Sequence, residues 1–108
     1  MISGRLGSIA LYNPIRTLLG ELELVELTAD LGAYFGTTEG ILVVRAPSNN
    51  RLELQDGDVL LEIGGRMPTS TWHAMRIFAS FEPGEALELS IMRSQRRETI
   101  ELELPNRD

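Results

Sequence analysis

The stretch Leu54–Pro68, "LQDGDVLLEIGGRMP", places two acidic residues around a glycine directly before an apolar run. Asp-Gly favours a tight turn, because glycine adopts positive φ freely and aspartate accepts hydrogen bonds from nearby backbone amides. The run from Val59 to Ile63 predicts a β-strand, and Gly64-Gly65 ends it at a second turn. The stretch therefore predicts a turn, a core strand and a turn that leads the chain into its next element.

The composition limits the chain to one folded domain and removes several classes of function. It has 108 residues, of which 43% are hydrophobic, enough for a single core. The net charge of −6 disfavours sequence-independent binding to nucleic acid, which is itself a polyanion. The chain has no cysteine, which excludes disulfides, thiolate zinc sites and cysteine nucleophiles. No apolar run approaches the length of a bilayer span, so we expect no direct membrane insertion.

The first half of the apolar pattern predicts a strand, a short helix and a second strand. Residues 22–27 alternate and then shift phase, as in a strand that bends or bulges. Thr28 is a favourable helix N-cap and Gly36 a favourable helix end. Residues 40–46, "GILVVRA", contain a continuous apolar run, which predicts a strand buried on both faces or nearly so. Two leucines of the connection that follows are expected to fill the core: Leu52 and Leu54.

The second half predicts a long helix and a hairpin. The helix is expected within residues 69–81, with Thr69 or Ser70 as its N-cap, and Pro83-Gly84 stops it. Its core face carries apolar residues three and four positions apart: Ala74, Ile77 and Phe81. Two alternating strands joined by the polar sequence "SQRR" then predict an antiparallel hairpin: residues 86–93 and 98–105.

Four motifs in this order resemble a bacterial-type PDZ domain. They are the short helix "LTADLGAYFG", the strand "GILVV", the stretch Leu54–Pro68, and Pro83-Gly84 ahead of a strand that ends at Arg93. The chain is most similar to PDZ domains of the high-temperature-requirement family of periplasmic proteases and of related envelope proteins. The resemblance covers roughly Gly20 to Pro105.

The resemblance implies a fold and a division of the chain. The fold would be α+β but mainly β: a five- or six-stranded, partly open barrel in the bacterial, circularly permuted strand order. One short and one long helix would cap this barrel. The chain would consist of an N-terminal arm at residues 1–18, a PDZ domain at residues 19–105 and a tail at residues 106–108.

The resemblance also implies a non-catalytic module that binds an extended peptide, usually a protein C-terminus, as an added strand. The edge strand maps to residues 22–27 and the opposite wall of the groove to the helix 71–81. The strand side of the site, with the loop before it, would comprise Leu19, Gly20, Glu21, Leu22, Glu23, Leu24 and Val25. The helix side would present residues next to the core stripe: Thr71, Met75 and Phe78. Met75 and Phe78 also fit an ordinary core, and this alternative stays open.

The loop before the edge strand departs from the family pattern. The family's loop ends in apolar-Gly-apolar, and its backbone amides hold the peptide carboxylate. Here the residues are Leu19-Gly20-Glu21-Leu22, so that either Glu21 replaces a second glycine or Gly20 is shifted by one. We hypothesise that Glu21 repels an anionic C-terminus and shifts the domain toward internal segments or protein surfaces.

No catalytic residue, cofactor or metal is expected. The chain lacks a Gly-x-Ser-x-Gly elbow, and we expect its single histidine, His73, on the solvent side of the helix. Asp56 and Asp58 fit turn chemistry better than metal binding, because no third ligand is near them in the sequence. An enzyme is therefore the least favoured function.

Two functions and two locations stay open. The groove either binds a peptide or is degenerate, in which case the domain is a scaffold for self-association or assembly of an envelope protein. A homo-oligomer would then form through the N-terminal arm. An exposed Trp72 fits both, since it is either covered by the arm or available to a partner. The resemblance implies a periplasmic or envelope location within a longer bacterial protein, and the cytoplasm stays an alternative.

Overall fold

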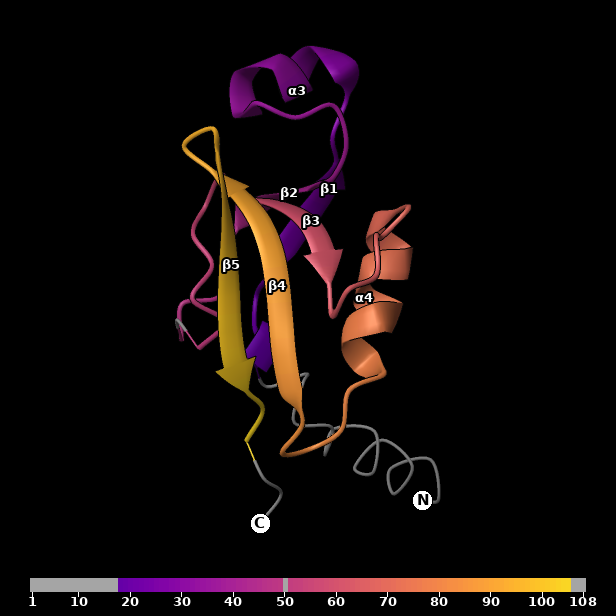
Figure 1. Ribbon diagram of the computed structural model, residues 1–108, viewed down its shortest axis with the longest axis vertical. Helices are drawn as coiled ribbons and strands as arrows, with labels where there is room; N and C mark the ends of the chain where they lie inside the picture. Colours follow the sequence, from indigo (N-terminus) through magenta and orange to yellow (C-terminus); the bar gives the residue numbers. More distant parts are fainter. Residues whose placement is uncertain (1–17, 50, 106–108) are drawn as a thin grey trace, which may run out of the picture.

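The computed structural model describes residues 18–49 and 51–105 (Figure 1). Seven elements follow one another in the predicted order of strand, short helix, two strands, long helix and two strands. They are β1 (Glu23–Glu26), α3 (Ala29–Phe35), β2 (Ile41–Arg45), β3 (Val59–Ile63), α4 (Thr71–Ala79), β4 (Ala86–Arg93) and β5 (Arg96–Glu103). The long helix lies inside the predicted range.

The strands form one open sheet in the order β1-β2-β3-β4-β5, with every neighbouring pair antiparallel. The hairpin of β4 and β5 is the longest ladder, with eight residue pairs, whereas β2 and β3 share only two. The sheet is strongly curved, and α4 lies beside β3 with α3 at one end (Figure 1). The predicted mainly β fold with one short and one long helix is confirmed, with five strands in an unclosed sheet.

The helix boundaries follow from the predicted caps. The Thr28 hydroxyl accepts a hydrogen bond from the Leu31 amide at 3.2 Å, and Gly36 ends α3 in the left-handed conformation with φ of 80°. Of the two candidate caps for α4, Ser70 is the one used, since its hydroxyl accepts from the His73 amide at 3.0 Å. Local sequence thus fixes where both helices begin.

The core is a single apolar cluster between the curved sheet, α4 and the connection from β2 to β3. Leu52 and Leu54 are 0% and 3% exposed and fill it as predicted. The expectation that β2 is buried on both faces is wrong, because Val44 is 46% exposed and only Ile41 and Val43 point into the core. A continuous apolar run therefore does not distinguish a two-sided strand from one whose outer face reaches solvent.

The two aspartates before β3 anchor the chain at both ends of this connection. The buried Asp58 carboxylate accepts hydrogen bonds from Arg93 Nε at 2.9 Å and from its Nη2 at 2.7 Å, and from the Gln55 amide at 2.8 Å. The hydrogen bond to Asp58 raises the pKa of Arg93. Asp56 accepts from the Ala46 amide at 2.7 Å. The stretch Leu54–Pro68 thus stabilises its own turn, and the bond between Asp58 and Arg93 connects this turn to the end of β4.

Candidate functional site

Among the described residues, no strand pairs with the edge of β1 that faces α4. Within residues 18–49 and 51–105, β1 has β2 as its only strand neighbour, and it stands at the end of the sheet. The helix α4 packs against both β1 and β3. Figure 1 shows that the end of β1 next to α3 and the start of α4 lie toward the same end of the molecule. The edge of β1 and the helix α4 thus lie next to each other, as the two walls of the predicted peptide groove would.

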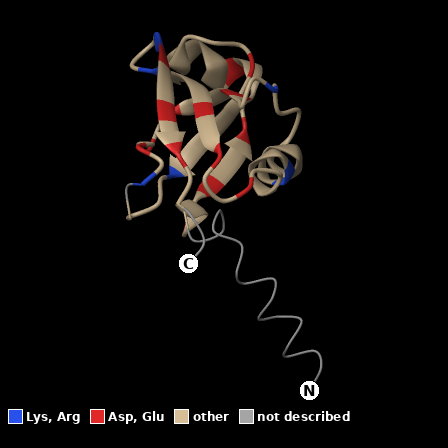
Figure 2. Cartoon of the chain, turned by 60° about the horizontal axis from the view of Figure 1, so that its bottom comes forward, with Lys and Arg blue, Asp and Glu red and all other residues tan. Residues whose placement is uncertain are grey.

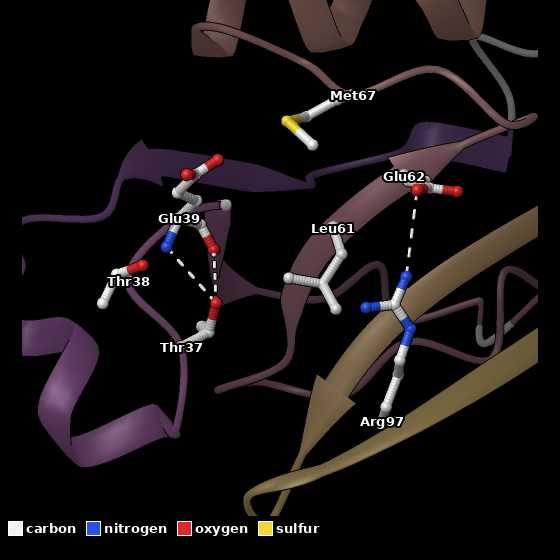
Figure 3. A pocket seen from close by; sticks show the side chains of 8 residues that line it. Thr37, Thr38, Glu39, Leu61, Glu62, Met67 and Arg97 are labelled. Atoms are coloured by element: carbon white, nitrogen blue, oxygen red, sulfur yellow. Dashed lines mark hydrogen bonds and ion pairs between the residues drawn. The ribbon is translucent and has the colours of Figure 1, made fainter.

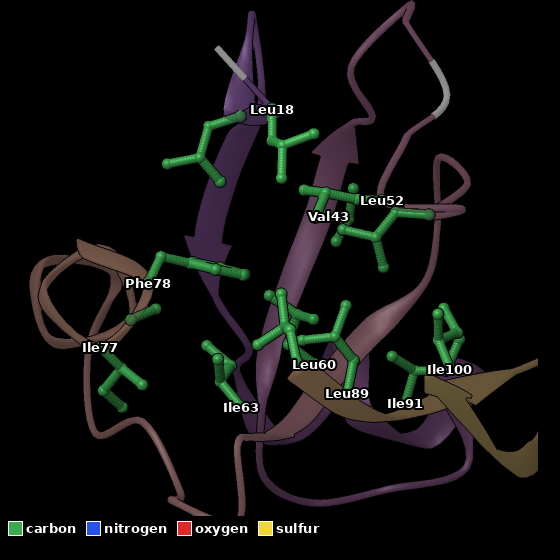
Figure 4. Packing of buried hydrophobic residues seen from close by; sticks show 14 of the residues in the cluster. Leu18, Val43, Leu52, Leu60, Ile63, Ile77, Phe78, Leu89, Ile91 and Ile100 are labelled. Carbon is green, nitrogen blue, oxygen red and sulfur yellow. The ribbon is translucent and has the colours of Figure 1, made fainter. Parts of the chain in front are cut away.

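The floor of the groove is apolar. Leu22, Leu24 and Met75 are half-buried and pack against the core cluster from the two walls. The side chain of Phe78 extends from α4 toward β1 and Leu18 (Figure 4). Thr71, at the first position of α4, is also half-buried. The predicted apolar members from both elements therefore pack against the same core cluster.

Phe78 occupies this site in a different way from the expectation. It is 0% exposed and belongs to the core, as does Ile77 at 2%. For Phe78, the alternative of an ordinary core residue is therefore the one that the structure supports. The predicted core stripe of Ala74, Ile77 and Phe81 is right for the first two residues only. The helix ends at Ala79, Phe81 is half-buried after it, and Phe78 takes the third core position. Met75 is the groove residue that keeps solvent contact.

Two predicted strand residues turn their side chains away from the groove. Val25 is paired with Leu42, whereas Leu24 is paired with the core residue Val43, so the two side chains lie on opposite faces. Val25 is 41% exposed, and Glu23 lies 3.6 Å from Arg45 in an exposed ion pair. The strand also contains the predicted irregularity, a register shift between Glu23 and Leu24. These residues can contribute backbone groups to the open edge but not side chains to the floor.

The loop before β1 is a tight turn around Gly20. The Leu22 amide donates to the Leu19 carbonyl at 2.9 Å, and Gly20 has φ of 50°. Leu19 is 6% exposed and belongs to the core, while Gly20 and Glu21 are exposed. The turn therefore has a buried leucine on one side and polar backbone on the other.

Glu21 is held by Ser48, in the loop after β2. Its carboxylate accepts from the Ser48 amide at 3.1 Å and from the Ser48 hydroxyl at 2.7 Å. The hydrogen bond from the Ser48 side chain is the main cause that lowers the pKa of Glu21, and its own backbone amide adds to the effect. Because β2 occupies the edge of β1 opposite to α4, this carboxylate is kept on the β2 side of the loop.

Leu18, predicted to belong to the N-terminal arm, is instead a core residue. Leu18 is 2% exposed and packs in the core beside Phe78. The rest of the proposed arm and the tail at residues 106–108 lie outside the described residues. The adjacent Leu18-Leu19 pair was the available signal, because two consecutive leucines before a turn fit a buried helical end. Trp72, expected at the surface, is 71% exposed.

No protein-family description and no curated protein matches this chain. Among solved structures it is similar to HtrA-type protease AlgW with a decapeptide, at 24% identity and a TM-score of 0.64, over 84% of this chain and 29% of that one. A variant of the same protease with a decapeptide gives 22% identity and a TM-score of 0.72, over 94% and 35%. The HtrA3 PDZ domain bound to the phage-derived ligand FGRWV is 18% identical with a TM-score of 0.61. The match covers 78% of this chain and 79% of that domain.

This is a PDZ-like fold. The likeness covers most of this chain but about a third of the AlgW chains, and nearly four fifths of the isolated HtrA3 PDZ domain. The predicted resemblance to PDZ domains of HtrA-type proteases is therefore confirmed at the level of the fold. Within the part of the PDZ-like domain that the structure describes, no helix is long and apolar enough to cross a membrane.

Proposed function

We propose that this PDZ-like domain is a non-catalytic module that binds an extended peptide by adding it as a strand to β1. The observation that carries the proposal is the open edge of β1 opposite α4. A strand edge carries backbone N–H and C=O groups at regular intervals, and an extended peptide satisfies them without any demand on its sequence. Affinity then comes from the backbone, and selectivity from the floor of the groove.

The floor selects an apolar side chain. Leu22, Leu24 and Met75 form this floor, and the buried Phe78 closes it from the core side. A leucine-sized or phenylalanine-sized side chain that leaves water at this site gains roughly 1.5–3 kcal/mol. The structural neighbours agree with this proposal, since those protease and PDZ structures contain peptides.

The hydrogen bonds that hold the Glu21 carboxylate support binding of internal peptide segments as well as free C-termini. Its carboxylate already receives hydrogen bonds from its own amide and from Ser48 at the turn where a peptide carboxylate would be held. A peptide carboxylate held at this turn has a fixed negative charge beside it, on the β2 side, and finds one backbone amide already used. Amidation of the C-terminus of a bound peptide should therefore cost this domain less than twofold in affinity, whereas Glu21→Gly should tighten binding of the free acid.

The test is a peptide screen followed by a matched pair of variants. Peptides with apolar C-terminal or internal residues are screened against the domain, and the selected peptide is titrated by fluorescence anisotropy. Met75→Asp should weaken binding at least about tenfold, because it places a charge in the apolar floor. Ala86→Asp puts the same charge on an exposed position of β4, away from β1 and α4, and should leave the affinity unchanged.

Amide exchange distinguishes strand addition from other binding modes. A peptide added to β1 should protect amides of Glu23–Glu26 that face the open edge, and β5 at the far edge should not respond. If no peptide binds and the chain instead self-associates, the scaffold function replaces this one.

We further propose that the domain serves a longer envelope protein, in keeping with the AlgW chains that it matches in part.

A further inference from the structure

Trp72, the second residue of α4, stands at the outer lip of the helix wall of the groove. It is the single tryptophan of the chain, and its side chain is exposed. Successive residues of a helix are turned by about 100°, so Trp72 lies about 60° beyond Met75 around the helix axis. This places it on the side away from the buried Ala74 and Ile77. The indole is therefore within reach of a peptide that lies along the groove floor.

Glu26, the last residue of β1, lies on the opposite wall. Directly paired residues of an antiparallel ladder turn their side chains to the same face of the sheet. Glu26 pairs with the core residue Ile41, and Leu24 pairs with the core residue Val43. The Glu26 side chain thus shares the face of Leu24, which packs against the core cluster. It is exposed and forms no ion pair in the part of the chain that the structure describes.

Both residues belong to the upstream end of the groove. The end of β1 and the start of α4 lie toward the same end of the molecule (Figure 1). A peptide whose C-terminal end is at the turn around Gly20 runs antiparallel to β1, and every second side chain of the peptide faces the floor. Leu22, Leu24 and Glu26 have the same two-residue spacing. The fifth peptide residue from the end is therefore level with Glu26.

A hollow of about 260 Å³ elsewhere on the domain is separate from this place (Figure 3). Its lining comes from the segment before β2, from β3, from Met67 and from Arg97, and includes no residue of β1 or α4. Glu62 in this lining is paired with Arg97 at 3.8 Å. The hollow therefore supplies nothing to the upstream end of the groove, where the carboxylate on the groove face is that of Glu26.

We propose that Trp72 and Glu26 form an upstream subsite for an arginine or lysine side chain at the fifth residue from the end of the bound peptide. The inference rests on the proposed strand addition. The side chain projects between the two walls, with the indole on one side and the carboxylate on the other. The face of an indole attracts a cation and also covers the aliphatic stem of a long side chain. The carboxylate adds an attraction that a neutral side chain does not receive.

The experiment uses three decapeptides of serine and glycine that contain no tryptophan and have valine at the last and third-from-last positions. They carry arginine, norleucine or glycine at the fifth position from the end. Fluorescein-labelled forms are titrated at low salt against the intact chain by fluorescence anisotropy. We expect the arginine peptide to bind about three- to fivefold more tightly than the norleucine peptide.

Two variants remove the two attractions one at a time. Trp72→Leu keeps an apolar side chain but removes the aromatic face, and Glu26→Gln removes the charge. Each should reduce the preference for arginine to about twofold or less. Glu101→Gln makes the same charge change at an exposed position of β5 and should preserve the preference. Arg76→Gln removes a positive charge one turn after Trp72 and should not weaken the preference.

The indole emission of the chain reports on the subsite directly, because Trp72 is its single source. The unlabelled arginine peptide should change this emission with the same midpoint as the anisotropy titration. The glycine peptide has no side chain at this position and should change the emission far less at saturation. Equal changes with both peptides would contradict contact between the arginine side chain and the indole.

The outcomes separate this inference from the function on which it rests. Equal binding of the arginine and norleucine peptides to the wild type refutes the subsite but leaves strand addition intact. A preference that survives both Trp72→Leu and Glu26→Gln also refutes it, because the attraction would then come from elsewhere. If none of the three peptides binds, the proposed function fails for these sequences and the subsite fails with it.

Discussion

The buried Asp58 carboxylate is the residue on which the turn before β3 depends most. Its side chain is 2% exposed, and it is paired with Arg93, whose guanidinium also donates to the Glu53 carbonyl at 2.9 Å. Asp58→Ala leaves this cation partly buried without its partner, and should lower the free energy of unfolding by about 3 kcal/mol. Asp56→Ala, which loses one exposed hydrogen bond to the Ala46 amide, should cost about 1 kcal/mol. Urea unfolding of both variants checks the ranking, and equal losses would mean that the ion pair contributes little.

The contact between Glu21 and Ser48 makes a pH-dependent prediction at the same scale. Because hydrogen bonds from Ser48 lower the pKa of Glu21 below its ordinary value of 4.5, Ser48→Ala should raise it back toward that value. The sign for stability follows from a folded pKa below the unfolded one. The contribution is present above about pH 4.5 and is lost as the pH falls through the folded value. Carboxyl ¹³C shifts measured over pH 2–7 follow Glu21 directly, and an unchanged titration in Ser48→Ala would contradict the assignment of the cause.

At the scale of elements, the hairpin of β4 and β5 turns on two residues that are not glycine. The predicted connection "SQRR" is shorter in the structure, because Arg96 and Arg97 already belong to β5. Ser94 and Gln95 have φ of 53° and 63°, in the left-handed region, and the Gln95 amide side chain donates to the Tyr34 carbonyl of α3 at 3.0 Å. The turn therefore also joins the hairpin to the short helix.

Substitutions of Ser94 measure the free energy that the left-handed backbone conformation costs. Asparagine tolerates the left-handed region better than serine, so Ser94→Asn should raise the free energy of unfolding by about 0.5 kcal/mol. Ser94→Val places a β-branched side chain there and should lower it by about 1 kcal/mol or more. Thermal unfolding of the two variants gives the comparison. A Ser94→Val variant as stable as the wild type would show that the turn relaxes to another conformation.

Elements and caps could be predicted from the sequence because they depend on local chemistry. Thr28, Gly36 and Ser70 act within one helical turn of their own positions, and the phase shift in residues 22–27 appears as a bulge. The exposure of Val44 and the burial of Phe78 could not be predicted in this way. Each depends on how far a neighbouring element lies from the strand or helix face, and that distance is set by the packing of the whole fold.

At the scale of the whole molecule, the net charge of −6 should steer cationic peptides toward the domain. Acidic side chains are spread over the strands, whereas basic ones appear at fewer places, including α4 (Figure 2). Raising the salt concentration from 0.1 M to 1 M shortens the screening length from about 10 Å to about 3 Å. The association rate of an arginine-containing peptide should then fall about three- to tenfold, with a smaller change in its dissociation rate. Stopped-flow fluorescence measures both rates, and a neutral peptide with the same salt dependence would refute steering.

The order of elements along the chain was enough to predict the fold, but the candidate site required the three-dimensional arrangement. Alternation and helical spacing are enough to predict that Leu22, Leu24 and Met75 lie on the faces that pack against the core. Ser48, which holds Glu21 in the loop before β1, could not be predicted in this way, because it lies 27 residues further along the chain and meets Glu21 only through the path of β1 and β2. Surfaces made by distant loops leave no periodic pattern in a sequence.

The open edge of β1 can pair with a peptide ligand, but it can also pair with the same edge of a second copy of the chain. Any unpaired edge is a template on which identical chains can aggregate. Here the edge is four residues long and irregular at Glu23, and α4 stands beside it. An incoming sheet carries its next strand about 4.8 Å further out, where it would meet the helix, whereas a lone peptide has no such neighbour. The helix α4 therefore leaves room for a single peptide strand but hinders the edge-to-edge aggregation of identical chains.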